Sequence, residues 1–298
     1  MLCHMAHNFP AFTENFLDRS ATLQKSFREE TITDMLIANI VALGGKNVVV
    51  DFPNELSTGA DMEWTLVDRS DGSFVRLLIQ AKRSYGKGKQ WGRHSFRELY
   101  HQSGTPKALQ AKVLCDTARA AAATYPLYIF YVPGKTCKLA RLDNALNASG
   151  VTLADGYEIE KLAISASDRK TRTKNRSSRT ISEKMFPLQS LFCPQSINKI
   201  GPMMFSRAAS VGPLFFDGTS FGYPTPPTPQ KICDAVNRLN DVREKNGAKS
   251  TEKQPLDVSF RIPEEIREVL ETGKFSSELK ASNTICKAVF ISRSDDSS

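Results

Sequence analysis

The chain has 298 residues, 40% of them hydrophobic, and its 40 Lys and Arg against 32 Asp and Glu give a formal net charge of +8. This composition fits a globular protein with one large domain or two small ones, and the charge favours polyanionic partners. No apolar stretch approaches the roughly 20 residues of a membrane span, and the first ten residues lack the order of a signal peptide. We therefore expect an intracellular, cytoplasmic protein.

The cysteines are widely scattered through the chain, at Cys3, Cys115, Cys137, Cys193, Cys233 and Cys286. They form no C-x-x-C pair, and the pattern places no nearby histidine at the spacing of zinc ligands. This distribution predicts reduced thiols in a cytosol.

The first half of the chain predicts a helix and then three strands. Residues 13–43 have apolar positions at three- and four-residue steps, which indicates a helix that stops at the glycines 44–45. The β-branched run 47–52 predicts a strand. Residues 61–68 and 74–82 predict a hairpin whose turn is supplied by Asp71 and Gly72.

The following segments predict a helix at 107–124 and a buried strand at 126–132, which together indicate an α/β layer with helices covering a central sheet. Beyond residue 132 the patterns are weaker. We expect another helix at 148–165, an exposed basic loop at 169–184, a short buried stretch at 186–194, a Pro-rich spacer at 222–230, amphipathic helices at 231–246 and 263–271, and a disordered tail at 292–298.

Polar side chains occupy matching positions in the predicted hairpin. Because side chains alternate along a strand, Asp61 and Glu63 share one face, and Gln80 and Lys82 share a face of the next strand. If the two strands pair through the turn, these four groups meet at one end of the hairpin.

This set of groups is suited to a hard divalent cation. Asp61, the side-chain oxygen of Gln80 and the carbonyl of Ala81 offer the oxygen ligands that Mg²⁺ or Mn²⁺ accepts. Lys82 would lie beside a metal-bound water and help it attack a phosphodiester, while the metal offsets transition-state charge. Glu29 or Glu30 on the upstream helix would hold the outer water shell of the metal, and the sequence does not choose between them.

The stretches "REETIT", "GADMEW", "IQAKR" and "PLYIFY" make the chain similar to the PD-(D/E)XK nuclease superfamily. It most resembles the branch with Gln in place of the second acidic residue, as in Mrr-like restriction endonucleases, and an uncharacterised bacterial domain family of that superfamily. The resemblance covers roughly residues 20–200. It implies a restriction-endonuclease-like αβββαβ core with a mixed sheet, in which Asp61 and Gln80 hold the metal and Lys82 is the catalytic lysine.

Other residues have two readings each. Glu63 is either a ligand of a second metal or the partner of Arg76 or Lys82. Gln110 contacts substrate or lies on a helix surface, and His94 and His101 contact phosphate or are solvated. The basic residues Arg83, Lys87, Lys89 and Arg93 interleave with Tyr85 and Trp91, which is typical either of a nucleic-acid-binding loop or of a solvated charged loop.

These expectations define a nuclease domain at 1–215, with its core at about 20–135, followed by a linker and a helical or partly disordered tail at 216–298. The expected activity is that of a magnesium-dependent endonuclease with a role in defence or restriction. Its expected substrate is nucleic acid, with DNA favoured over RNA. The alternative is a degenerate relative that binds nucleic acid or a protein without chemistry. A homodimer, and a protein partner bound through 222–230 and the C-terminal helices, stay open.

Overall fold

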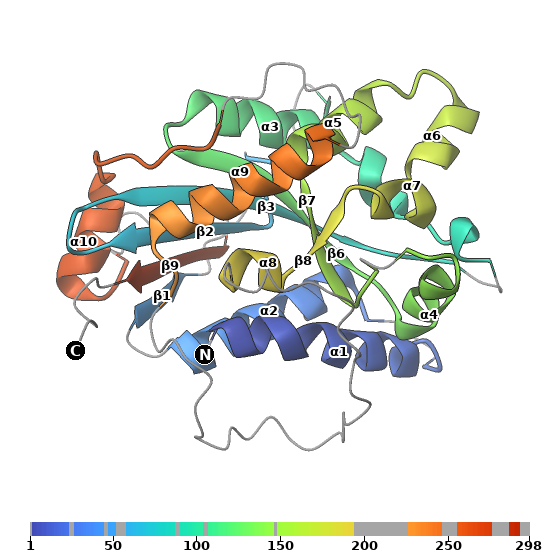
Figure 1. Cartoon of the computed structure of the whole chain (residues 1–298), viewed down its shortest axis with the longest axis horizontal. Coiled ribbons are helices and arrows are strands. Elements are labelled where there is room, and N and C mark those ends of the chain that lie inside the picture. Colours follow the sequence, from blue (N-terminus) through green and yellow to red (C-terminus); the bar gives the residue numbers. More distant parts are fainter. Residues whose placement is uncertain are drawn as a thin grey trace.

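A seven-stranded mixed sheet with the order β1-β9-β2-β3-β6-β7-β8 forms the centre of the protein (Figure 1). The computed structural model describes residues 2–23, 27–44, 47–51, 58–86, 90–103, 107–145, 148–193, 226–245, 255–275 and 286–292. The strands are β1 (Val48–Asp51), β2 (Met62–Asp68), β3 (Phe74–Arg83), β6 (Thr124–Tyr131), β7 (Val151–Asp155), β8 (Met185–Pro187) and β9 (Cys286–Ser292). β9 runs parallel to β2 and β3 runs parallel to β6, whereas the other neighbouring pairs are antiparallel.

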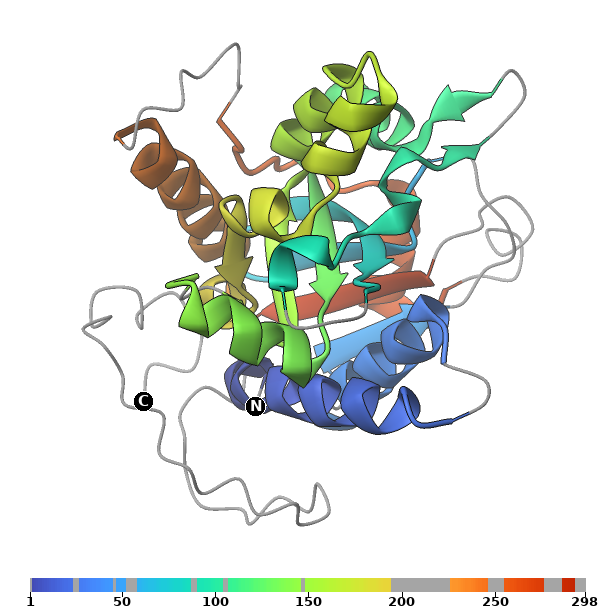
Figure 2. The same cartoon turned by 90° about the vertical axis from the view of Figure 1, so that its right-hand side faces the viewer.

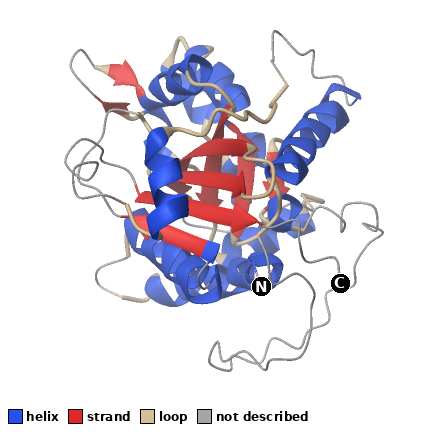
Figure 3. Ribbon diagram, turned by 90° about the vertical axis from the view of Figure 1, so that its left-hand side faces the viewer, coloured by secondary structure: helices blue, strands red, loops and turns tan. Residues whose placement is uncertain are grey.

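Helices cover both faces of the sheet (Figures 1 and 3). One face packs on α1 (Leu2–Ser20), α2 (Glu29–Gly44), α8 (Gln189–Phe192) and α9 (Pro229–Lys245). The other face packs on α3 (Gln110–Ala120), α5 (Gly156–Ile164), α7 (Ser178–Ser182) and, over β2 and β9, α10 (Glu264–Thr272). The remaining helices are α4 (Gly134–Leu142) and α6 (Arg169–Asn175). The expected α/β class, with a mixed sheet flanked by helices, is confirmed.

The β2–β3 hairpin follows the predicted alternation. Trp64 and its neighbours on the same face of β2 are buried against α1, α2 and α8, whereas Leu78 of β3 belongs to the opposite core beneath α3. Each large apolar side chain buried in this way contributes about 1.5–3 kcal/mol relative to an exposed one. The turn is also as predicted, because Gly72 has a φ of 73° and the Asp71 carboxylate accepts a hydrogen bond from the Ser73 amide at 2.8 Å.

α3 provides the connection between the parallel strands β3 and β6. Parallel neighbours require a long crossover, and a helix packed on the sheet is the usual solution. Before α3 the chain forms the short helix η3 (Arg97–Tyr100) and a separate antiparallel pair, β4 (Gln102–Ser103) with β5 (Ala108–Leu109). Figure 2 shows this pair standing apart from the main sheet, at the upper right.

Several predictions for the second half of the chain are wrong. The C-terminal segment contributes more than helices and a tail, because β9 lies between β1 and β2 inside the sheet. Residues 148–165 form β7 and then α5 rather than one helix, and the expected loop 169–184 contains α6 and α7. The two amphipathic helices are confirmed as α9 and α10. The predicted helix 13–43 is divided between α1 and α2. Residues 222–225 of the Pro-rich segment lie outside the described residues.

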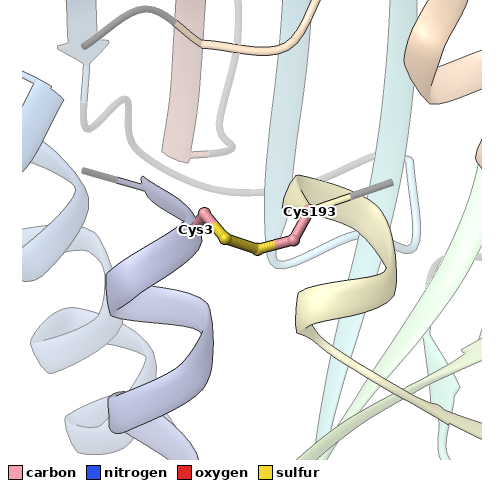
Figure 4. The surroundings of a disulfide bond; sticks show 2 residues. All are labelled: Cys3 and Cys193. Atoms are coloured by element: carbon pink, nitrogen blue, oxygen red, sulfur yellow. A yellow bond between two sulfur atoms is a disulfide. The ribbon is translucent and has the colours of Figure 1, made fainter. Parts of the chain in front are cut away.

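The prediction that all thiols are reduced is also wrong. Cys3 at the start of α1 and Cys193 after α8 form a disulfide across 190 residues, with Cα atoms 5.3 Å apart (Figure 4). Spacing along the chain contains no information on this contact, because the packing of α1 on α8 creates it. Cys115, Cys137 and Cys233 are buried free thiols. Within the described ranges, no helix combines the length and apolarity that a membrane crossing requires.

Candidate functional site

Asp61, Gln80 and Lys82 meet at one end of the β2–β3 hairpin. Asp61 immediately precedes β2, and the antiparallel register places it across from the last residues of β3, with its amide donating to the carbonyl of Ile79 at 2.8 Å. Oδ2 of Asp61 accepts a hydrogen bond from the Ala81 amide at 2.7 Å and another from Nε2 of Gln80. The backbone of β3 thus fixes the carboxylate beside the amide side chain.

The fold requires a glycine at position 59, two residues before Asp61. Gly59 adopts a φ of 73°, and a Cβ atom there would lie 2.9 Å from the carbonyl oxygen of Gln110 and 2.9 Å from the amide nitrogen of Leu114. Only glycine avoids both the strained backbone and the clash with the first turn of α3. The close approach lets the start of β2 lie against α3, which is how Asp61 and Gln110 reach the same cavity.

Glu29 is the helix glutamate that faces the hairpin. It is the first residue of α2, where the helix dipole favours a carboxylate. Its Oε1 lies 3.6 Å from Nζ of Lys82, and its Oε2 accepts a hydrogen bond from the Arg83 amide at 3.0 Å. Glu30 also lines the cavity, but it is 58% exposed and pairs with Arg28 at 2.9 Å. Of the two candidates, Glu29 is therefore the one that contacts Lys82.

A cavity of about 370 Å³ connects these groups, and its wall consists of Arg28, Glu29, Glu30, Asp61, Gln80, Lys82, Tyr85, Glu98, His101 and Gln110. Six of the residues predicted for the site are therefore brought together. Four acidic and two basic side chains lie in this wall, so acidic groups predominate in the cavity. Such a cavity attracts a cation.

Burial and crowding of carboxylates shift their protonation. Burial raises the pKa of the Asp61 carboxyl above its usual value, and the charge of Glu30 raises it further. Lys82 and the hydrogen bond from the Ala81 amide act in the opposite direction. Burial also raises the pKa of Glu29, and the charge of Asp61 adds to this, against the stabilising effect of Lys82. A divalent cation between these carboxylates would offset both causes.

Two amide oxygens are available for a ligand. Oε1 of Gln80 and Oε1 of Gln110 are buried and accept no hydrogen bond from the described part of the chain. For Gln80 the reason is clear, because its Nε2 donates to Asp61 and, at 3.2 Å, to the carbonyl of Ala81. Turning the amide over would place oxygen against carboxylate. A buried acceptor without a donor is costly, and Mg²⁺ would satisfy it, so the residues present fit the metal.

Two residues expected at the metal lie outside the cavity wall. Glu63 shares the face of Asp61 but pairs with Arg76 at 3.1 Å, and Arg76 in turn contacts Glu265 of α10 at 3.1 Å. Lys287 of β9 completes this network. The pair with Arg76, one of the two roles expected for Glu63, is therefore present, and Glu63 is not part of the cavity wall that would hold the metal. Ala81 contributes its amide to Asp61, while its carbonyl accepts from Gln80.

The residues predicted to contact nucleic acid differ in their placement. Gln110 lines the cavity and Arg93 is exposed, whereas Lys87 and Lys89 lie outside the described residues. Arg83 is only 6% exposed and lies over the ring of Tyr85 at 5.2 Å. Its Nε and Nη1 donate to no acceptor in the described ranges. Arg83 is thus buried at the end of β3 rather than part of a solvated loop, and it is not among the residues of the cavity wall.

The two other candidates in this region are structural. Trp91 is buried and donates from Nε1 to Asp143 at 2.8 Å, so it is not a stacking platform for bases. His94 is buried, and its Nδ1 lies 2.9 Å from the hydroxyl of Thr136. His101, in contrast, is exposed and lines the cavity.

Arg28 and Glu98 also line the cavity, although no sequence pattern predicted a role for either residue. Arg28 directly precedes the helix that carries Glu29, so its position next to a candidate residue was the only available sign. Glu98 lies in η3, and its carboxylate is 3.9 Å from Nδ1 of His101. Irregular segments have no periodicity from which such contacts can be read.

The fold and the cavity define an α/β protein with an acidic, partly buried site built around Asp61, Gln80 and Lys82. The sequence model of DUF6615, a family of unknown function, matches residues 2–297, and the chain belongs to this family. A search of curated proteins gave no match. A search of solved structures gave no match either.

Proposed function

We propose that the protein is a metal-dependent nuclease that hydrolyses phosphodiester bonds, with DNA as its substrate. The observation that carries the proposal is the contact of the Asp61 carboxylate with the Gln80 amide beside the Lys82–Glu29 ion pair, in one acidic cavity. The chain order α2–β1–β2–β3–α3–β6 supports a restriction-endonuclease-like core, with β9 as an added strand between β1 and β2.

Asp61 and Oε1 of Gln80 would hold Mg²⁺ or Mn²⁺, and Glu29 would accept hydrogen bonds from its water shell. A bound divalent cation lowers the pKa of water and stabilises charge on a phosphoryl oxygen. Lys82 is held by Glu29 at 3.6 Å, with a side chain only 4% exposed. In this position its ammonium orients the attacking water and stabilises developing negative charge.

A nucleic-acid strand needs cations outside the acidic cavity, and the structure provides them on α6. Four basic side chains of this helix are exposed, namely Arg169, Lys170, Arg172 and Lys174. Arg172 lies 5.7 Å from the ring of Tyr100, which connects α6 with η3 and hence with Glu98 at the cavity. Phosphates bound along α6 would offset the repulsion between the cavity and the substrate backbone.

The test is cleavage of plasmid and linear DNA, and of an RNA of the same sequence, with Mg²⁺ or EDTA. We expect Mg²⁺-dependent cleavage of DNA that is lost in Asp61→Asn and Lys82→Met. Glu63→Gln is the matched control, because it removes a carboxylate charge from β2 outside the cavity. Equal cleavage by the wild type and both site variants would reject the mechanism. Salt-sensitive DNA binding without metal-dependent turnover would support the degenerate relative instead.

A further inference from the structure

Cys3, His7 and Cys193 form a second cluster, outside the candidate nuclease site. The two sulfur atoms and one ring nitrogen of His7 all lie within 4.8 Å of one another. Cys3 and His7 are four residues apart on α1, so their side chains lie on the same face of the helix. Cys193 joins them from the end of α8 (Figure 4).

We propose that these three residues form a redox-controlled site for a soft divalent cation such as Zn²⁺. In the oxidised protein the sulfur atoms are bonded to each other and cannot act as thiolate ligands. Reduction by a dithiol transfers two electrons and two protons, so that the reductant becomes a disulfide and the protein gains two thiols. Zn²⁺ then binds both sulfur atoms as thiolates and the imidazole of His7, with the release of two thiol protons.

The ligand set matches the chemistry of zinc. Two thiolates and one imidazole are established zinc ligands, and three protein ligands leave the fourth tetrahedral position for water. Spacing along the chain does not predict this cluster, because Cys193 approaches Cys3 from 190 residues away.

Access from solvent distinguishes Cys3 from the buried free thiols. His7 is exposed and Cys3 is partly exposed, so a reductant and a metal ion can reach the cluster from solvent. Cys115, Cys137 and Cys233 are buried, and burial raises the pKa of each, which opposes the thiolate form. Cys193 is itself buried, so among the cysteines whose side chains are described it is Cys3 that a reductant meets from solvent, and Cys193 is reached through its bond to Cys3.

The test uses the full chain and Co²⁺ as a spectroscopic substitute for Zn²⁺, since a thiolate bound to Co²⁺ gives a charge-transfer absorption in the near ultraviolet. We expect one equivalent of Co²⁺ to produce this absorption in dithiol-reduced protein and none in oxidised protein. Cys3→Ser and Cys193→Ser should abolish it, and His7→Ala should weaken the affinity at least roughly tenfold. Zn²⁺ should displace the Co²⁺.

Cys233→Ala is the thiol control, and Asp61→Asn shows that the absorption does not arise at the nuclease site; both should retain it. If the serine variants fail to fold, the Co²⁺ affinity of His7→Ala tests the proposal, because His7 is exposed and its replacement should leave the fold intact. The proposal is overturned if reduced protein gives no thiolate absorption, if His7→Ala binds Co²⁺ as tightly as the wild type, or if the disulfide resists reduction in the folded protein.

Discussion

Gln80 donates a hydrogen bond from its amide nitrogen to the Asp61 carboxylate, and this contact leaves Oε1 of Gln80 without a donor among the described residues. The amide therefore has a defined orientation, with one oxygen available beside a carboxylate. Under the proposed function, Gln80 would supply this oxygen as a metal ligand without adding a negative charge. Metal affinity would then depend on the charge at position 80 as well as on its geometry.

Replacing Gln80 by Glu tests that balance. The added carboxylate should tighten Mn²⁺ binding at least roughly tenfold, because the cation gains a charged ligand. The metal-free protein should lose on the order of 1–3 kcal/mol in free energy of unfolding, because two carboxylates then repel each other in a buried site. Titration calorimetry and urea unfolding in EDTA measure both effects. Gln102→Glu is the control, because Gln102 is exposed and lies outside the cavity wall, and it should change neither the Mn²⁺ affinity nor the stability. An unchanged Mn²⁺ affinity in Gln80→Glu would contradict the assignment of Gln80 as a metal ligand.

Lys82→Met separates chemistry from metal binding. The variant keeps the length of the side chain and removes the ammonium that lies 3.6 Å from Glu29. We expect the cleavage rate to fall by roughly 100- to 10,000-fold, whereas Mn²⁺ affinity stays the same or rises because a nearby positive charge is gone. Lys184→Met, which removes a lysine paired with Glu158 elsewhere in the fold, should leave cleavage unchanged. Wild-type turnover in Lys82→Met would exclude Lys82 from the mechanism.

Gly59 and Gly72 form a matched pair for testing how the site is positioned. Both have a φ of 73°, but only at Gly59 would a Cβ atom come within 2.9 Å of the backbone of α3; at Gly72 the nearest atom is 3.6 Å away. Gly72→Ala should cost about 1–2 kcal/mol for the strained backbone. Gly59→Ala should cost roughly 2–5 kcal/mol and also weaken Mn²⁺ binding, since Asp61 must shift. Equal losses in the two variants would show that the contact with α3 is unimportant.

The raised pKa values of Asp61 and Glu29 predict how the site responds to pH. Protons compete with the metal, so Mn²⁺ affinity should fall as the pH is lowered through these raised values. In the metal-free protein the free energy of unfolding should instead decrease as the pH rises. The reason is that a raised carboxyl pKa gives stability that is present at low pH and lost as the pH rises through the folded-state pKa. In EDTA, the advantage of Asp61→Asn over the wild type in unfolding free energy should therefore grow with pH. An advantage that shrinks with rising pH would contradict this.

The hairpin part of the site was predictable because local rules determine it. Alternation along the strands puts Gln80 and Lys82 on one face, and the turn at Asp71 and Gly72 sets the register that carries Asp61 to them. The choice between Glu29 and Glu30 was not predictable. Both fit the start of a helix, and only the direction in which α2 meets β3 shows which one reaches Lys82.

Contacts between distant segments account for the main errors. β9 follows a weakly patterned stretch and is paired with β1 and β2, which lie more than 200 residues earlier in the chain. The choice between the two roles of Glu63 stayed open because Glu265 and Lys287, which complete its network with Arg76, approach only when α10 and β9 dock. The Cys3–Cys193 bond has the same origin. In each case the missing information was the packing of one element on another.

The most direct test of the metal site is a calorimetric titration of the purified protein with Mn²⁺, with a melting curve at saturation. The wild type should bind at the Asp61 site and gain about 2.7 kcal/mol of stability when the free metal is at 100 times its Kd. Glu63→Gln should behave in the same way, whereas Asp61→Asn should bind at least tenfold more weakly and gain little. Equal Mn²⁺ binding by the wild type and Asp61→Asn, or no binding by either, would contradict the account.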